Sequence, residues 1–225
     1  MRYLLTILLS AGIHFCFAQQ QHVMLKLAPL ALIDDPSFPT IQAGIEYKLS
    51  KRFSWYNEAG IKYRQSTMET NDTSFVHSAG FKFKTECRYY YKNRQEDIFK
   101  GLYYAINFFL TRDRYNNELN YYNRYDSAGP LLHDIIGVKK NVWGMNILFG
   151  KQKMLGRKWS LDMYAGMGFR HRNIRTIHQE FDSAYHDLQS PVDLNVPFIR
   201  DEADSRGGSR TLFNFTAGIR FGYKF

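Results

Sequence analysis

Residues 213–225 alternate without exception between apolar side chains and polar or small ones. The odd positions run Phe, Phe, Ala, Ile, Phe, Tyr and Phe, whereas the even positions run Asn, Thr, Gly, Arg, Gly and Lys. Successive side chains of a β-strand point to opposite faces, whereas an α-helix repeats about every 3.6 residues. The segment is therefore predicted to be a strand that separates an apolar environment from a polar one.

The same two-residue period recurs along the rest of the chain, and no stretch shows helical periodicity of comparable strength. A weaker alternating segment runs from Val23 to Ala31 and is interrupted by Pro29. The clear alternating segments are residues 41–49, 53–64, 81–89, 102–111, 143–150 and 159–170. Together with the C-terminal segment, these predict eight strands.

The connections between the predicted strands alternate in length. Short or moderate turns lie near residues 50–52, 92–100 and 151–158, whereas long polar loops lie near residues 115–133 and 173–209. Outer-membrane barrels have short turns at the periplasmic end and long loops at the external end. The sequence therefore predicts an all-β fold, a closed eight-stranded antiparallel transmembrane β-barrel with both chain ends at the periplasmic end.

A soluble barrel with an apolar interior would show the same alternation, but three features favour the inverted arrangement. The apolar positions are rich in Phe, Trp, Tyr and Met, which are too bulky for the interior of an eight-stranded barrel. Glycines such as Gly44, Gly60, Gly166 and Gly218 lie on the charged face, where a crowded interior needs small residues. The chain also ends on Phe225, and a terminal aromatic residue is favoured by the machinery that inserts barrels into bacterial outer membranes.

The N-terminal residues predict export. Arg2 is followed by the apolar run Tyr3–Phe17 and then by the small residue Ala18, the arrangement of a secretory signal peptide. We expect residues 1–18 to be a signal peptide and residues 19–225 to be one outer-membrane barrel domain. The formal net charge of +9 is compatible with nucleic-acid binding, but export makes anionic lipid the expected counterpart.

Three short segments carry a resemblance to known proteins. They read Lys-Leu-Ala-Pro-Leu at 26–30, Ala-Gly-Ile-Glu-Tyr at 43–47 and Gly-Ile-Arg-Phe-Gly-Tyr-Lys-Phe at 218–225. With the strand pattern, the chain resembles small OmpA/OmpX-type outer-membrane β-barrels and, more closely, uncharacterised outer-membrane barrels of the Bacteroidetes. The resemblance implies contact with outer-membrane lipid and lipopolysaccharide, and with the barrel-insertion machinery through the strand ending at Phe225. We expect a monomer, no nucleic-acid partner and no cofactor.

The charged residues of the polar face are expected to form a network inside the barrel, because buried charge requires partners. Lys26 belongs to the same face. The predicted network consists of Glu46, Lys48, Glu58, Lys62, Arg64, Lys82, Lys84, Glu86, Arg88, Asp162, Arg170 and Arg220. These side chains predict a polar, plugged interior and a structural or surface-interaction role for the long external loops. Because bases outnumber acids, a narrow anion-preferring channel is an alternative, although eight strands leave little room for one.

A catalytic alternative is a lipid A-modifying enzyme of the deacylase or acyltransferase type, in which a Ser nucleophile needs a base within hydrogen-bond reach. His171, His178 and His186 could converge with Asp182 and Ser183 near the last loop, but no spacing requires it, and we expect no enzyme. The chain has no zinc-protease motif, phosphate loop or nucleotide fingerprint, and we expect no metal. Two Asp-Ser-Ala triplets in predicted external loops make Ser127 and Ser183 candidates for O-glycosylation.

Overall fold

The computed structural model describes the following residues: 23–33, 40–63, 75–91, 99–126, 129–177, 180, 182, 184–188 and 208–225. The predicted signal peptide lies outside them. The strands are β1 (Val23–Leu27), β2 (Thr40–Lys48), β3 (Phe53–Lys62), β4 (Phe75–Tyr91), β5 (Gly101–Asn123), β6 (Leu132–Leu155), β7 (Trp159–Ile177), β8 (His186–Leu188) and β9 (Gly208–Lys224), and a 3-10 helix, η2, spans Pro29–Ile33. Among these residues, no helix is long and apolar enough to cross a membrane.

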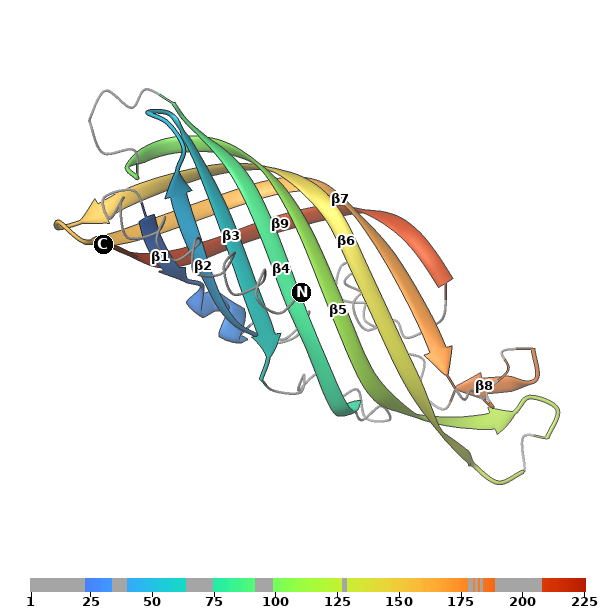
Figure 1. Ribbon diagram of the computed structural model, residues 1–225. Coiled ribbons are helices and arrows are strands. Elements are labelled where there is room, and N and C mark those ends of the chain that lie inside the picture. Colours follow the sequence, from blue (N-terminus) through green and yellow to red (C-terminus); the bar gives the residue numbers. More distant parts are fainter. Residues whose placement is uncertain are drawn as a thin grey trace, which may run out of the picture.

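Eight of the strands pair side by side in a ring, shown in Figure 1. β1 pairs with both β2 and β9, so the first and last of the described strands are neighbours. β7 pairs directly with β9, and the pairing of β4 with β5 completes the ring of eight strands. Every pairing is antiparallel. The prediction of an all-β fold with eight antiparallel strands in a ring is confirmed.

The two faces of the ring have opposite character. Ile147 and Phe215, on the outward face, are 63 % and 60 % exposed, whereas Arg88 and Arg220, on the inward face, are fully buried. The burial pattern of β2 alternates strictly from Thr40 to Tyr47 in the phase that the sequence predicts. Large apolar side chains therefore point away from the ring and charged side chains point into it, the reverse of a soluble protein.

The strand pair formed by β5 and β6 runs much farther than the sequence predicts. The ladder between β5 and β6 continues from Gly101↔Gln152 to Tyr121↔Leu132, through the region expected to be a loop at 115–133. The alternation is lost there because many residues of this part are polar on both faces, yet the main-chain groups still pair. This β5–β6 extension projects beyond the ring at the end opposite the C-terminus (Figure 1).

Other strand boundaries also differ from the prediction. β1 ends at Leu27 and Pro29 begins the 3-10 helix, because proline has no N–H to donate to a strand ladder. β6 runs to Leu155, so the predicted turn at 151–158 shrinks to Gly156–Lys158. Gly156 has a φ of 76°, which favours glycine in this tight turn.

The short strand β8 was not predicted and lies on the extension. It pairs with the end of β5 through Tyr121↔Leu188, Tyr122↔Asp187 and Asn123↔His186. Arg124 and Asp187 reinforce the pairing with a 2.6 Å ion pair. Near this end, the long strands pack together through a small buried cluster. Its members are Tyr115, Tyr121, Val138 and Ile174. The described part of the last loop therefore forms an ordered three-stranded platform with the extension.

Candidate functional site

Four cations and four carboxylates meet inside the ring, and we call them the interior ion cluster. They are Lys26, Lys84, Arg88 and Arg220, with Glu46, Glu58, Glu86 and Asp162. Apart from Lys84, whose side chain is 23 % exposed, their side chains are at most 1 % exposed. They come from six different strands, so the cluster ties the ring together across its interior.

Arg88 on β4 is the centre of one half of the cluster. Its Nη1 donates to Oδ2 of Asp162 on β7 at 2.9 Å, and its Nε donates to Glu86 on its own strand, also at 2.9 Å. Lys26 on β1 donates to the same Asp162 oxygen at 2.8 Å and lies 2.6 Å from Glu46 on β2. Because β1, β4 and β7 are not neighbours in the ring, these contacts fix the polar face of the strands as the inward one.

Arg220 on β9 is the centre of the other half of the interior ion cluster. Its Nε donates to Oε2 of Glu58 on β3 at 2.8 Å, and its Nη2 donates to Oε1 of Glu86 on β4 at 2.7 Å. Lys84 lies 2.8 Å from the second oxygen of Glu58. Hydrogen bonds between ionised partners are the strongest that side chains make, so each carboxylate here is held in a fixed position.

Three buried tyrosines complete the cluster. The hydroxyls of Tyr56, Tyr90 and Tyr103 donate to Glu58, Glu46 and Asp162 at 2.6, 2.8 and 2.8 Å, respectively. The Arg88 guanidinium also lies 4.5 and 4.6 Å from the ring centroids of Tyr56 and Tyr103, within the range of a cation–π contact. The aromatic rings fill the space between the charges, and their hydroxyls add hydrogen bonds to three of the four carboxylates.

The interior ion cluster contains as many carboxylates as cations, so its formal charge is zero. The count of all polar-face residues in the sequence suggests an excess of bases. The difference arises because Lys48, Lys62, Lys82 and Arg170 lie elsewhere. Lys48 is half-buried at the end of β2, and among the described residues it takes no part in the cluster.

Three further bases of the predicted network lie nearer the β5–β6 extension. Lys62 pairs with Asp113 of β5 at 3.0 Å, and Lys82 is 8 % exposed on the inward face of β4. Arg170 is half-buried on β7. Arg64 lies outside the described residues. The structure therefore separates the predicted network into a compact cluster and a second inward set.

Sequence reasoning missed several members of this interior. Gln152 accepts from both Lys26 and Tyr90, at 2.7 and 2.8 Å, but it falls in the segment predicted to be a turn. Asp113 occupies an odd position of β5, as the inward-facing Asn107 does. Extending the predicted strand by two residues beyond Thr111 would therefore have included Asp113 among the inward residues. The predicted network contains charged residues only and therefore leaves out the buried tyrosines, although Tyr56 and Tyr90 occupy even positions beside inward charges.

On the outward face, a serine and a histidine meet near the long-loop end of the ring. Oγ of Ser209 on β9 lies 2.9 Å from Nε2 of His171 on β7, and Nδ1 of His171 lies 3.0 Å from Oγ1 of Thr211. In the tautomer protonated on Nδ1, His171 donates to Thr211 and accepts from Ser209. The imidazole also lies 5.3 Å from the ring centroid of Trp143. This is the geometry that a serine nucleophile and its base require.

Of the other histidines and serines considered from the sequence, the structure describes His186. The backbone N–H of Asp182 donates to Nδ1 of His186 at 3.0 Å. His178 and both candidate O-glycosylation sites, Ser127 and Ser183, lie outside the described residues. Within the described part of the chain, no group of His, Cys, Asp and Glu could hold a metal ion.

Comparison with known proteins gives one match. No curated protein and no solved structure matches the chain. A family model described as "Protein of unknown function (DUF3575)" matches residues 4–189, which is most of the chain. This protein therefore belongs to the DUF3575 family.

Proposed function

We propose that this protein is an outer-membrane β-barrel of a Gram-negative bacterium, of the small OmpA/OmpX type found in the Bacteroidetes, with a structural or surface-interaction role. The observation that carries the proposal is that the ring has apolar side chains on its outward face and charged side chains on its inward face, the reverse of a soluble barrel. Ile147, Phe215 and Trp143 are more than half exposed on the outward face, while Arg88 and Asp162 are fully buried on the inward one. Such an outward surface is unfavourable in water and favourable in lipid.

The length of the apolar surface supports a membrane location. A strand tilted across a bilayer needs about 9–11 residues. The outward apolar positions of β5 run from Leu102 to Leu110, and those of β7 run from Trp159 to Phe169. Beyond these limits the outward side chains become polar or basic, as at Arg112 on β5. The apolar belt therefore has the height of a hydrocarbon core.

The interior supports a structural role over a channel. A conducting barrel needs a continuous polar path, whereas the residues of the interior ion cluster are paired with one another across the ring. Phe99 and Met24 are also fully buried and belong to an apolar cluster with Leu148. Both sets occupy the interior, so ions would have to displace paired charges to cross.

The β5–β6 extension supports a surface-interaction role. It stands beyond the apolar belt, at the end where the longest connections lie, and β8 makes it a three-stranded platform. The aromatic side chains of Tyr125 and Tyr185 are 77 % and 57 % exposed near its tip. Exposed aromatic residues on an ordered scaffold are the residues that protein interfaces use most.

Fractionation and conductance together test the proposal. The protein expressed in a Gram-negative host should sediment with outer membranes, and the purified protein in planar bilayers should conduct no more than a bare bilayer. Recovery in the periplasm or cytoplasm would contradict the membrane location. Stable anion-selective steps would instead favour the channel.

A second candidate function is hydrolysis or transfer of an acyl group of an outer-membrane lipid. Ser209 and His171 favour it because they form a hydrogen-bonded pair on the outward face. In hydrolysis, His171 would take the hydroxyl proton as Ser209 attacks the ester carbonyl, and would then return it to the leaving alcohol; water would release the acyl group from Ser209. Thr211 would hold the imidazole orientation.

Fatty-acid release from lipid A tests the second candidate. The wild-type protein in detergent should release fatty acid, Ser209→Ala should abolish the release, and Ser50→Ala at the opposite end should leave it unchanged. Absence of release by the wild-type protein, or release that survives Ser209→Ala, would rule this function out while leaving the structural role untouched.

A further inference from the structure

Three basic residues lie side by side on the outward face, just beyond the apolar belt. Arg114 of β5 is the cross-strand partner of Lys139 on β6, and Lys139 is the partner of Arg175 on β7. All three side chains are exposed, and each is flanked along its strand by inward-facing residues. Arg112, exposed on the same face of β5, lies two residues from Arg114. We call these four residues the basic row.

The basic row is unfavourable by itself. Cationic side chains directly opposite one another on a sheet repel and destabilise the pairing. Among the described residues, none of Arg112, Arg114, Lys139 and Arg175 forms an ion pair with a carboxylate; Asp113, the nearest acid along β5, points inward to Lys62. An anion from outside the chain would remove this repulsion.

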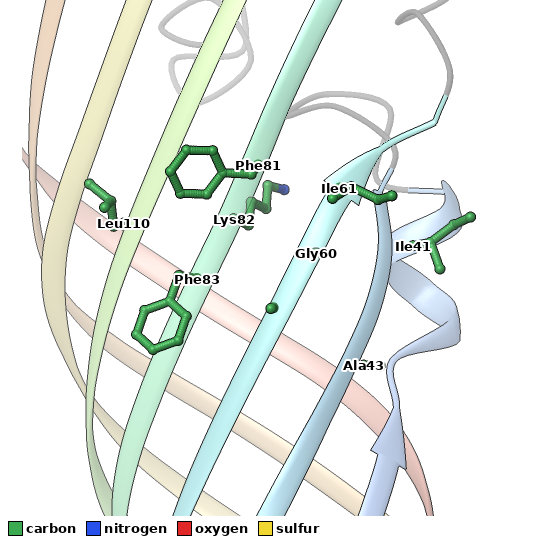
Figure 2. Close-up of a pocket in the computed structure, with 9 residues that line it drawn as sticks. Ile41, Ala43, Gly60, Ile61, Phe81, Lys82, Phe83 and Leu110 are labelled. Atoms are coloured by element: carbon green, nitrogen blue, oxygen red, sulfur yellow. The ribbon is translucent and has the colours of Figure 1, made fainter. Parts of the chain in front are cut away.

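The apolar belt is hollowed beside the row. The hollow has a volume of about 490 Å³ and lies over β2, β3, β4 and β5 (Figure 2). Its lining includes Ala43, Ala59 and Gly60, which have little or no side-chain bulk. Phe81 and Phe83 stand along its β4 side (Figure 2). Its lining is almost wholly apolar, so the occupant that it suits is a hydrocarbon chain.

The hollow and the basic row meet at one place. Phe81, which lines the hollow, is the cross-strand partner of Arg112, and the guanidinium of Arg112 lies 5.9 Å from the centroid of the Phe81 ring. Leu110 lines the hollow on the same face of β5 as Arg112 and Arg114. At about 3.4 Å per residue, Arg114 lies ~14 Å along the strand from Leu110. A ligand with a charged head and a chain could reach both sites.

We propose that this face binds a phosphorylated, acylated glycolipid of the lipopolysaccharide class. The basic row holds its phosphate, and one of its acyl chains lies in the hollow. Arginine suits this role because its guanidinium forms bidentate hydrogen bonds with phosphate oxygens. The proposal rests on the proposed outer-membrane location, since the long-loop end would then lie in the leaflet that carries such lipids.

Lipid binding by the purified protein in detergent tests whether the basic row binds the phosphate of the lipid. Native mass spectrometry with bis-phosphorylated lipid A should show a bound lipid, and Arg114→Gln/Lys139→Gln/Arg175→Gln should weaken its binding by at least about tenfold, because charge-assisted hydrogen bonds are lost. The matched control, Lys151→Gln/Lys153→Gln/Arg157→Gln, removes three exposed bases at the opposite end and should change binding by less than about twofold. Equal loss in both variants would mean non-specific charge attraction and would overturn the proposal.

The hollow is tested separately. Ala59→Leu fills it and should weaken lipid A binding, whereas Ala165→Leu, an exposed alanine on β7 outside the hollow, should not. Inorganic phosphate at the same concentration should not displace the lipid, because it has no chain to occupy the hollow. Displacement by phosphate, or unchanged binding by Ala59→Leu, would overturn the acyl half of the proposal.

The failure of this inference is distinguishable from the failure of the proposed function. Circular dichroism first verifies that each variant retains its β structure. A wild-type protein that sediments with outer membranes but binds lipid A no better than the charge-neutralised variant overturns the lipid site alone. A wild-type protein found outside the membrane overturns the proposed function, whatever its affinity for lipid A in detergent.

Discussion

The Nη1 atom of Arg88 lies 2.9 Å from the Oδ2 atom of Asp162, so that a guanidinium on β4 and a carboxylate on β7 meet across the interior of the ring. Both side chains are fully buried. The same carboxylate accepts hydrogen bonds from Lys26 and Tyr103, each at 2.8 Å. Asp162 thus links β1, β4, β5 and β7, four of the eight strands in the ring.

Replacing Asp162 with Asn should lower the free energy of unfolding by about 3–5 kcal/mol, the usual effect of removing one member of a buried ion pair. The cations of Arg88 and Lys26 stay buried while one of their carboxylate partners is gone. Urea unfolding of the protein in lipid vesicles, followed by circular dichroism, measures the change. Asp126→Asn, at an exposed position of the tip, is the control, and a loss for Asp162→Asn as small as the control's would contradict the role of the cluster.

Strand parity could predict which charged residues point inward, but it could not predict which of them touch. Glu46, Glu58, Glu86 and Arg88 follow from a two-residue period that is visible in the sequence. The contact between Arg88 and Asp162 depends instead on strand tilt and stagger around the ring, which no single segment encodes. For the same reason, the neutral balance of the cluster could not be read from a count of inward bases and acids.

Gly150 leaves the space that the Tyr103 ring occupies on the neighbouring strand. A methyl group at Gly150 would collide with this ring, and Tyr103 would lose its position beside Asp162. Gly150→Ala should therefore lower the free energy of unfolding by about 1–3 kcal/mol. Gly137→Ala on the same strand is the control, because its methyl group would meet Ile177 at an ordinary 3.6 Å. Equal urea midpoints for the two variants would argue against close packing at Tyr103.

Substitutions of two isoleucines on the outward face of β6 distinguish a membrane protein from a soluble one. Ile147 lies in the apolar belt and Ile135 lies in the extension, with exposed fractions of 63 % and 52 %. The proposed location predicts that Ile147→Arg costs about 2–4 kcal/mol in vesicles, whereas Ile135→Arg costs at most about 1 kcal/mol. A soluble protein would tolerate both changes alike, so equal unfolding free energies for the two variants would refute the lipid contact.

The full length of β5 and β6 could not be predicted from the alternation of side chains. Alternation identifies a strand only where its two faces meet different environments, as in the apolar belt. Residues of the extension such as Asn116 and Asn120 face water or polar neighbours, so the pattern fades although the ladder continues to Tyr121↔Leu132. β8 has only three residues and depends on the end of β5 for its pairing, so it had no detectable signal of its own.

The docking of β8 on β5 should depend on pH. The hydrogen bonds from Arg124 hold the pKa of Asp187 below its usual value, which is about 3.9 for an aspartate. A lowered pKa in the folded state means that the contribution to docking is present above the usual value and is lost as the pH falls through the folded one. The N–H of Arg124 donates to the carbonyl of Tyr185 at 2.8 Å, which joins the end of β5 to the segment that leads into β8. Hydrogen exchange at the Arg124 amide, corrected for the intrinsic rate, should therefore show weaker protection below about pH 4.

The Asp187→Asn variant gives the matching result at neutral pH. It should expose the Arg124 amide to exchange at pH 7 as acid does in the wild-type protein, while Asp126→Asn leaves it protected. The effect should be small, because Arg124 and Asp187 are both exposed to solvent. Protection that is the same at pH 3 and pH 7 would show that main-chain pairing alone holds β8.

The last prediction concerns the orientation of the ring in the membrane. In a Cys87→Ser background, Tyr125→Cys places a thiol at the tip of the extension and Arg157→Cys places one in the turn at the opposite end. The short turns and the C-terminus share that opposite end, which is the periplasmic end in outer-membrane barrels. A membrane-impermeant maleimide added to intact cells should therefore label Tyr125→Cys at once and Arg157→Cys only after the outer membrane is permeabilised. Labelling in the reverse order would show that the basic row faces the periplasmic leaflet, and the phosphate that it binds would then have to belong to a phospholipid and not to a lipopolysaccharide.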